Sequence, residues 1–279
     1  MRLTVDHATT YRYDQPVRSV VQSHRLTPSV FDGQKTVDWA VSVSGGDPGG
    51  AFRDGAGDWV QGWTVAGPVS EITVTVRGTV ETMDLAGILR GHRESAPPAA
   101  YLRPTEATRA DAALQALAQG VTATDPLALA HALAEAVAGA IAYTPGVTDA
   151  GTTAAEAMAK GQGVCQDHAH ALIACALSRG VPGRYVSGYL FASEDGMPHE
   201  AAHAWAELHV PGLGWVGFDP ANNCCPDQRY IRLGSGSDAA RAAPIRGIAR
   251  GLVGAVAETM DVMVAVQSAG QSAGQSAEQ

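Results

Sequence analysis

Three side chains whose types cooperate in covalent catalysis occur in distinctive local sequences. Cys165 lies in GQGVCQD at residues 161–167, His203 begins HAWAE, and Asp219 precedes the proline that ends GWVGFDP at residues 214–220. A thiolate is a nucleophile, an imidazole can take up its proton, and a carboxylate can hold that imidazole in one tautomer. The set predicts a cysteine-dependent acyl-transfer enzyme with Cys165 as the nucleophile.

The thiol must be positioned so that its anion is favoured, because only the thiolate attacks. A glycine-rich turn precedes Cys165, and the apolar run after it predicts a helix over residues 165–179 that stops at Gly180. A thiol at the start of a helix lies near the positive end of the helix dipole, which favours the anion. The unpaired backbone N–H of Cys165 can also donate to a developing oxyanion.

The two partners of the thiol are expected on strands. Apolar runs over residues 184–191, 202–210 and 214–218 read as three strands, which places His203 and Asp219 on one sheet. The residue before a proline is biased toward extended backbone, so Asp219 should lie at a strand end. We therefore expect the helix of the nucleophile to pack on a sheet that carries the other two residues.

The rest of the chain divides by composition. Apolar residues alternate over residues 1–84 between turns rich in Gly, Pro and Asp, which indicates an antiparallel β-sandwich-like module. Ala-rich helical segments follow at 106–119 and 125–142, and the TAAE run at residues 153–156 is a capping box that opens a short helix. The fold class is thus α+β. We expect a module at 1–84, a linker at 85–100, a core at 101–266 and a disordered tail at 267–279.

Composition narrows the partners. The net charge of −9 argues against nucleic acid or an anionic membrane surface as the main partner. The N-terminus lacks an uninterrupted apolar segment, so we expect a cytoplasmic protein with four free thiols, of which Cys175 is a core residue. With no phosphate-binding glycine loop and no acidic calcium loop, we expect no cofactor.

The three local sequences together resemble the core of the transglutaminase-like superfamily, in its bacterial branch. The resemblance extends to GVPGRYVSGYL at residues 180–190 and to YTPG at residues 143–146. In the first 84 residues, HATTYRY at residues 7–13 and RLTP at residues 25–28 are similar to the β-rich region that precedes this core. The resemblance implies a papain-like fold, a triad of Cys165, His203 and Asp219, and chemistry without a metal.

Other residues near these motifs are candidates for substrate binding. Gln162 can offer its amide to an oxyanion or belong to the turn, and Trp205 and Trp215 can wall the cleft or simply pack. A metal site of Cys165, His168, His199 and His203 has suitable ligand types, but its spacing matches no standard zinc pattern. We therefore expect no metal.

Three functions remain open. A hydrolase would cleave a peptide or another amide-containing substrate through a thioester on Cys165 that water resolves. A transamidase would use the same triad with an amine as acceptor, because the acyl-enzyme does not record its acceptor. A peptide-binding module with an inactive core is the third, although no triad residue is missing. The resemblance favours hydrolysis.

Overall fold

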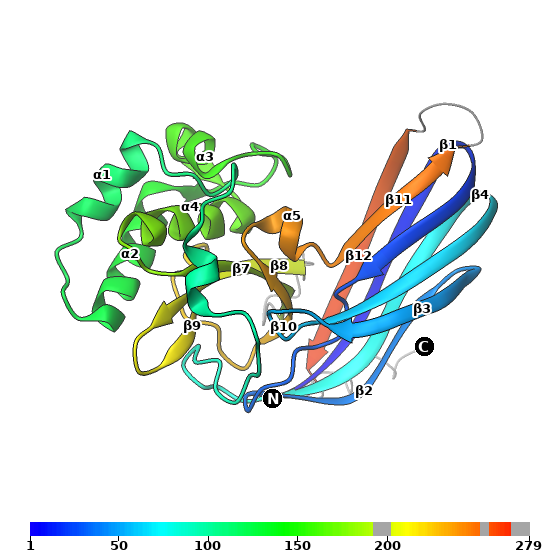
Figure 1. Ribbon diagram of the computed structural model, residues 1–279, viewed down its shortest axis with the longest axis horizontal. Helices are drawn as coiled ribbons and strands as arrows, with labels where there is room; N and C mark the ends of the chain where they lie inside the picture. Colours follow the sequence, from blue (N-terminus) through cyan, green and yellow to red (C-terminus); the bar gives the residue numbers. More distant parts are fainter. Residues whose placement is uncertain (192–201, 252–256, 269–279) are drawn as a thin grey trace, which may run out of the picture.

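The structure is a computed structural model that describes residues 1–191, 202–251 and 257–268. It has two lobes, as Figure 1 shows: a sheet of long curled strands on one side, and a lobe of helices around a smaller sheet on the other. The mixed α/β architecture confirms the predicted fold class. No helix among the described residues is long and apolar enough to cross a membrane.

The N-terminal sheet is antiparallel and is built on two long strands. Its strands are β1 (Arg2–His24), β2 (Gln34–Val43), β3 (Gly46–Arg53), β4 (Trp59–Thr82), β11 (Ile245–Gly251) and β12 (Glu258–Ser268). β4 pairs with β1 over most of its length, and β2 and β3 pair with successive parts of β4. The antiparallel N-terminal module takes the form of one curled sheet.

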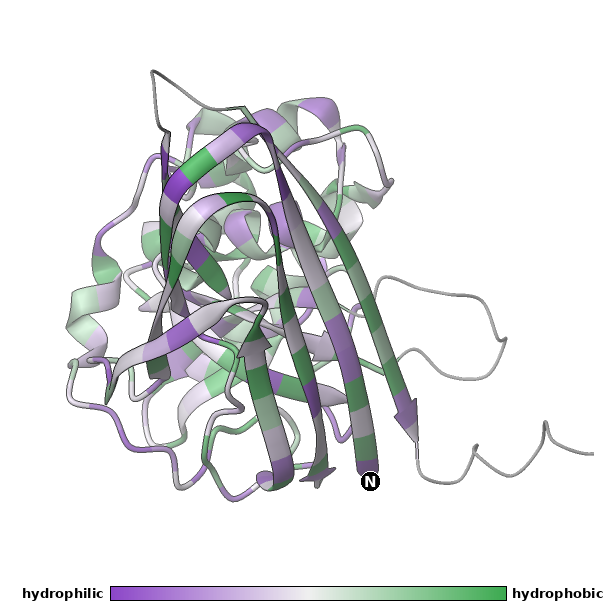
Figure 2. Ribbon diagram, turned by 90° about the vertical axis from the view of Figure 1, so that its right-hand side faces the viewer, coloured by the Kyte–Doolittle hydropathy of each residue, from purple (hydrophilic) through white to green (hydrophobic). Residues whose placement is uncertain are grey.

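Alternating side chains give this sheet its inner and outer faces. Leu3, Val5, Val74 and Val76 are almost fully buried, whereas their neighbours in sequence face outward. Figure 2 shows the same alternation as hydrophobic and hydrophilic bands along the long strands. Because successive side chains of a strand point to opposite faces, the period of two in the sequence predicts this correctly.

The last strands differ from the expected domain division. The sequence suggests that residues up to 266 belong to the core, but β11 and β12 both pair with β1 of the N-terminal sheet. A strand edge with unpaired N–H and C=O groups favours such pairing, and the two C-terminal strands cover the edge of β1. The predicted tail begins inside β12, and residues 269–279 lie outside the described residues.

The helical lobe surrounds a four-stranded antiparallel sheet with the order β10-β7-β8-β9. Its elements are η1 (Pro98–Leu102), α1 (Ala112–Gly120), α2 (Pro126–Ala140), α3 (Ala154–Lys160), α4 (Cys165–Ser178), β7 (Gly183–Leu190), β8 (Ala202–Val210), β9 (Gly214–Phe218), β10 (Tyr230–Gly236) and α5 (Ala239–Ala242). Two short strands, β5 (Ala142–Tyr143) and β6 (Gln162–Gly163), pair in parallel beside α4.

Helix α4 is the centre of this lobe. Its residues from Ala169 to Ala176 are buried, and it packs against α1, α2, α3 and the strand β8. A helix that is buried on all sides is apolar on all sides, which is what the Ala-rich sequence supplies. Cys175 lies in this run, and burial raises the pKa of its thiol to about 12, so this cysteine is an inert core residue as expected.

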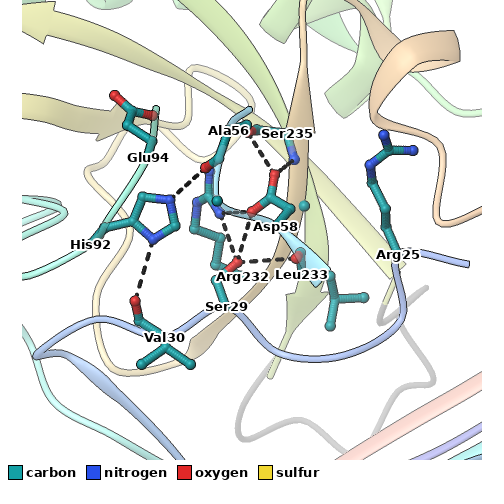
Figure 3. A network of polar contacts seen from close by, with 12 residues as sticks. Arg25, Ser29, Val30, Ala56, Asp58, His92, Glu94, Arg232, Leu233 and Ser235 are labelled. Carbon is teal, nitrogen blue, oxygen red and sulfur yellow. Dashed lines mark hydrogen bonds and ion pairs between the residues drawn. The ribbon is translucent and has the colours of Figure 1, made fainter. Parts of the chain in front are cut away.

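A buried network of charges joins the two lobes (Figure 3). Asp58, which precedes β4, accepts hydrogen bonds from Nη1 of Arg232 at 2.6 Å and from the backbone N–H of Ser235 at 2.7 Å. From β10, Nε of Arg232 donates to Glu207 on β8 at 2.8 Å, and Nε of Arg184 on β7 donates to the same carboxylate at 2.7 Å. The N-terminal sheet is thus tied to three strands of the other lobe.

The linker takes part in this network. Glu94 accepts hydrogen bonds from Arg184 and from the indole N–H of Trp215, and Ile88 forms a bridge with Val216 on β9. Residues 85–100 therefore lie against the edge of the smaller sheet. Burial would raise the pKa of Glu207, but the neighbouring arginines lower it to about 2, so this buried carboxylate is ionised.

Candidate active site

Cys165 is the first residue of α4, as the sequence predicts. The preceding turn is held by Asp167, whose Oδ2 accepts from the backbone N–H of Val164 and from the hydroxyl of Thr148, each at 2.7 Å. This carboxylate caps the helix at its third residue, where the dipole also favours a negative charge. The thiol of Cys165 is half-buried, so a substrate can reach it.

His203 lies near the start of β8, beside Asp219 and Cys165. Its Nε2 is 2.6 Å from Oδ2 of Asp219, and Cys165 is near enough to contribute to the raised pKa of the ring. Burial would lower the pKa of His203, but the hydrogen bond to Asp219 and the nearby Cys165 raise it to about 9. The imidazole is therefore protonated near neutral pH, which is the state that pairs with a thiolate.

Asp219 follows the end of β9 and is 1% exposed. Its Oδ2 accepts hydrogen bonds from the imidazole of His203, from the amide of Asn222 at 2.7 Å and from the hydroxyl of Tyr230 at 2.8 Å. Its Oδ1 accepts from the backbone N–H groups of Ala221 and Asn222 at 3.1 and 3.3 Å. Burial would raise the pKa of Asp219, but these hydrogen bonds and the charge of His203 lower it, so the carboxylate stays ionised.

Asn222 and Tyr230 are the two site residues that the sequence analysis did not identify. Asn222 Nδ2 also lies 3.3 Å from Nε2 of His203, and the Tyr230 ring meets His203 edge-on at 5.9 Å. The position of Asn222, three residues after Asp219 in a polar turn, is a signal that could have found it. Tyr230 had no such signal, because the strand β10 that carries it was not predicted.

The three predicted substrate-binding residues have different surroundings. Trp205 is 3% exposed, with its ring 6.4 Å from that of His203 and edge-on to Tyr230 at 5.4 Å. Its ring packs against the imidazole and offers little surface to a substrate. Gln162 is exposed on β6, next to the nucleophile, and its role in binding an oxyanion stays a prediction.

Trp215 does not reach the site. Its indole packs under the guanidinium of Arg184 at 4.0 Å, and on β9 it pairs with His209 of β8. His209 is six residues beyond His203, so the two positions are separated by roughly 20 Å of strand at about 3.3 Å per residue. The geometry does not support a cleft wall at Trp215, and packing accounts for its burial.

The alternative metal site is not assembled either. Both ring nitrogens of His168 lie 2.9 Å from backbone carbonyl oxygens, those of Val164 and Ile141, and so are already engaged. His199 lies outside the described residues. Within the part of the chain that the structure describes, no group of three His, Cys, Asp or Glu residues is arranged to hold a metal ion.

Comparisons with known proteins agree with this architecture. Residues 115–220 match the family model of the transglutaminase-like superfamily, and residues 3–81 match that of the bacterial transglutaminase-like N-terminal region. An uncharacterised protein of Mycobacterium leprae is 29% identical, covering 95% of this chain and 98% of its own. One of Mycobacterium tuberculosis is 32% identical, covering 88% of this chain and 87% of its own.

A solved structure has the same fold over nearly the whole chain. It is that of "a Putative Cysteine Protease" from Cytophaga hutchinsonii, with a TM-score of 0.70 and 21% identity, covering 96% of this chain and 91% of the other. The match includes both lobes. Their combination in one chain is therefore shared with this bacterial structure.

Proposed function

Because the chain belongs to the transglutaminase-like superfamily, we propose that it is a cysteine-dependent enzyme that cleaves an amide or isopeptide bond through a thioester on Cys165. The observation that carries the proposal is His203, hydrogen-bonded to Asp219 and influenced by Cys165, with a protonated imidazole beside two groups that favour its charge. Superfamily membership and the fold shared with a structure named as a cysteine protease support a cysteine-dependent enzyme.

The residues have distinct roles in the proposed reaction. The Cys165 thiolate adds to the carbonyl carbon, and the N–H groups at the start of α4 stabilise the oxyanion. The imidazolium of His203 gives its proton to the amine as the C–N bond breaks, which leaves a thioester. The neutral imidazole then takes a proton from water, whose oxygen adds to the thioester and releases the acid and the thiolate. Asp219 holds the imidazole in one tautomer throughout.

Hydrolysis is favoured over amine transfer. Both reactions proceed through the same thioester, and the acceptor alone distinguishes them. The name of the structural neighbour is that of a protease, which favours water as the acceptor. A peptide or another amide-containing molecule is the proposed acyl donor.

The first test is the reactivity of the thiol. We expect limiting iodoacetamide to alkylate Cys165 rapidly and once per chain, as seen by intact-mass spectrometry and peptide mapping, and much more slowly in His203→Ala. Cys165→Ala is the control for the site of labelling. Slow labelling shared with Cys224 and Cys225, and unchanged in His203→Ala, would contradict the proposal and favour a peptide-binding module.

The second test separates the two reactions. Wild type and Cys165→Ala are incubated with a peptide library, with and without a primary amine at high concentration, and the products are identified by mass spectrometry. Free acids that persist in the presence of the amine indicate hydrolysis. Amide products that replace the acids indicate a transamidase. Cleavage by Cys165→Ala would contradict the assignment of Cys165 as the nucleophile.

A further inference from the structure

The N-terminal sheet contains a hollow of about 370 Å³ that the proposed reaction does not use. Three of the five tryptophans of the chain line it, Trp39 from β2 and Trp59 and Trp63 from β4. Trp59, Gln61 and Trp63 alternate along β4, so they share one face of the sheet. Indole rings on this face present flat apolar surfaces, with Gln61 as a polar group between them.

The lining of the hollow is uncharged. Its other residues are His24, Leu26, Thr27, Val41 and Pro48, so no Asp, Glu, Lys or Arg contributes to it. His24 is 1% exposed, and burial lowers its pKa to about 4, which makes the imidazole neutral near pH 7. The lining itself therefore offers no counter-charge to a ligand, and the one charged group noted beside it is the guanidinium of Arg53, 5.7 Å from the centroid of the Trp59 ring.

Two buried polar atoms of the lining have no hydrogen-bond partner among the described residues, Nδ1 of His24 and Nε1 of Trp63. Nε2 of His24 donates to Oε1 of Gln22 at 2.9 Å, which leaves Nδ1 as an acceptor, whereas Nε1 of Trp63 is a donor. The two rings stack with centroids 6.0 Å apart. Hydroxyl groups both donate and accept, so a ligand rich in hydroxyl groups can supply a partner to each of these atoms.

An extended peptide fits this hollow less well. Peptides that bind to a sheet add to an edge strand through a continuous series of backbone hydrogen bonds. The edge here is formed by β2 and β3, whose pairing registers with β4 break between Thr36 and Asp38 and between Pro48 and Ala51, and Pro48 lacks an N–H. The hollow thus offers aromatic faces and hydroxyl partners beside a poor backbone template.

We propose that this hollow binds a neutral saccharide, with the C–H faces of its rings on the indoles of Trp39, Trp59 and Trp63 and with hydroxyl groups as partners of Trp63 Nε1 and His24 Nδ1. The site goes beyond the proposed function and does not require Cys165. Both unpaired atoms are shielded from water as the rings stand. We therefore expect binding to part the two rings and to change the fluorescence of Trp63.

The test is a fluorescence titration of the full chain carrying Cys165→Ala, so that turnover cannot affect the result. The probes are the tetramer of N-acetylglucosamine, cellotetraose and maltotetraose, each up to about 10 mM, where even a weak specific site saturates. We expect a saturable change in tryptophan emission with at least one probe. Trp59→Ala removes an indole ring that would pack on the sugar, and Trp63→Phe removes the indole N–H donor. Each substitution should weaken binding about tenfold.

The matched control is Phe52→Ala, which removes an exposed aromatic ring of β3 that does not line the hollow. It should bind as tightly as the parent. Should Trp63→Phe fail to fold by circular dichroism, Trp59→Ala alone decides, because Trp59 is only half-buried. No saturable response to any of the three probes, or equal affinity in Trp59→Ala and the parent, would overturn the proposal. None of these results bears on the thiol chemistry.

Discussion

His203 lies between two groups that favour its charged form, and its protonation should therefore govern the pH dependence of the site. Its pKa is raised from 6.5 to about 9, so the imidazolium stabilises the folded state fully below pH 6.5, and this stabilisation is lost as pH rises through about 9. Over the same range the proposed reaction loses the acid that protonates the leaving amine.

We expect kcat/KM on a peptide substrate to fall as pH rises through about 9. The measurement is a pH–rate profile between pH 5 and pH 10 under conditions where the protein remains folded. In Asp219→Asn the falling limb should move to lower pH, because the carboxylate is one of the groups that raise the pKa of His203. If the falling limb keeps its position in that variant, the loss of activity at high pH does not report the deprotonation of His203.

Asp219→Asn should also lower the rate itself. The substitution retains the shape of the side chain but removes its negative charge and can turn an amide N–H toward the imidazole, which disturbs the tautomer, so we expect kcat to fall by about two to four orders of magnitude. KM should change little. The measurement is steady-state kinetics near neutral pH, and a kcat within twofold of wild type would remove Asp219 from the proposed triad.

The hydroxyl of Tyr230 acts on the imidazole through Asp219, and its ring contacts His203 edge-on, which makes it a positioning residue. Tyr230→Phe deletes one of five hydrogen bonds to that carboxylate, so we expect kcat to fall about fivefold, with the alkaline limb shifted and KM retained. Tyr11→Phe, which removes a hydroxyl from the N-terminal sheet, is the control. If both variants show the same pH profile as wild type, Tyr230 serves packing alone.

At the scale of the elements, the first turn of α4 positions the nucleophile. Asp167 is fully buried there and holds the backbone N–H of Val164. Asp167→Ala should lower the free energy of unfolding by about 1–2 kcal/mol and slow the alkylation of Cys165, because the helix start loses its cap. Urea denaturation and the iodoacetamide assay measure the two effects.

The capping box of α3 offers a matched control. Glu156 caps that helix by accepting from Thr153, but it is exposed and belongs to a different helix start. Glu156→Ala should therefore leave the alkylation rate of Cys165 unchanged. Equal slowing in both variants would mean that the effect is one of general stability and not of the helix that carries the thiol.

For the whole molecule, the buried charges between the lobes decide whether the two sheets keep their relative position. Arg232 is 2% exposed and joins Asp58 of one lobe to Glu207 of the other. Arg232→Met leaves both carboxylates buried without this partner, so we expect a loss of about 3–5 kcal/mol in the free energy of unfolding. Since Tyr230 lies on the same strand, the rate should fall as well.

The control is Arg12→Met, which breaks exposed ion pairs on the N-terminal sheet with Glu71 and Asp261. Exposed pairs contribute little because water screens them, so no measurable change in unfolding is expected. Chemical denaturation of the two variants and wild type gives the comparison. Equal midpoints for Arg232→Met and Arg12→Met would show that the network does not hold the lobes together.

The sequence alone determined the features that depend on near neighbours. The glycine turn and apolar run predict α4 with Cys165 at its start, the two-residue period predicts the long strands, and the TAAE run predicts the cap of α3, all of which the structure has. These signals are local, because helix capping and strand alternation are decided within a few residues of the chain. The local sequences also single out His203 and Asp219, whose side chains lie 2.6 Å apart in the structure.

Tertiary structure alone decided the features that depend on pairing between distant segments. It brought Tyr230 to Asp219 from an unpredicted strand, removed Trp215 from the site by the register of β8 and β9, and returned Ile245–Ser268 to the edge of β1. The local sequence of Trp215 is the same whether or not it faces a cleft, and only the strand register determines its distance from His203. The turn between Val210 and Gly214 sets that register, whereas long-range backbone pairing places Tyr230 and Ile245–Ser268, and such pairing leaves no periodic pattern in the sequence.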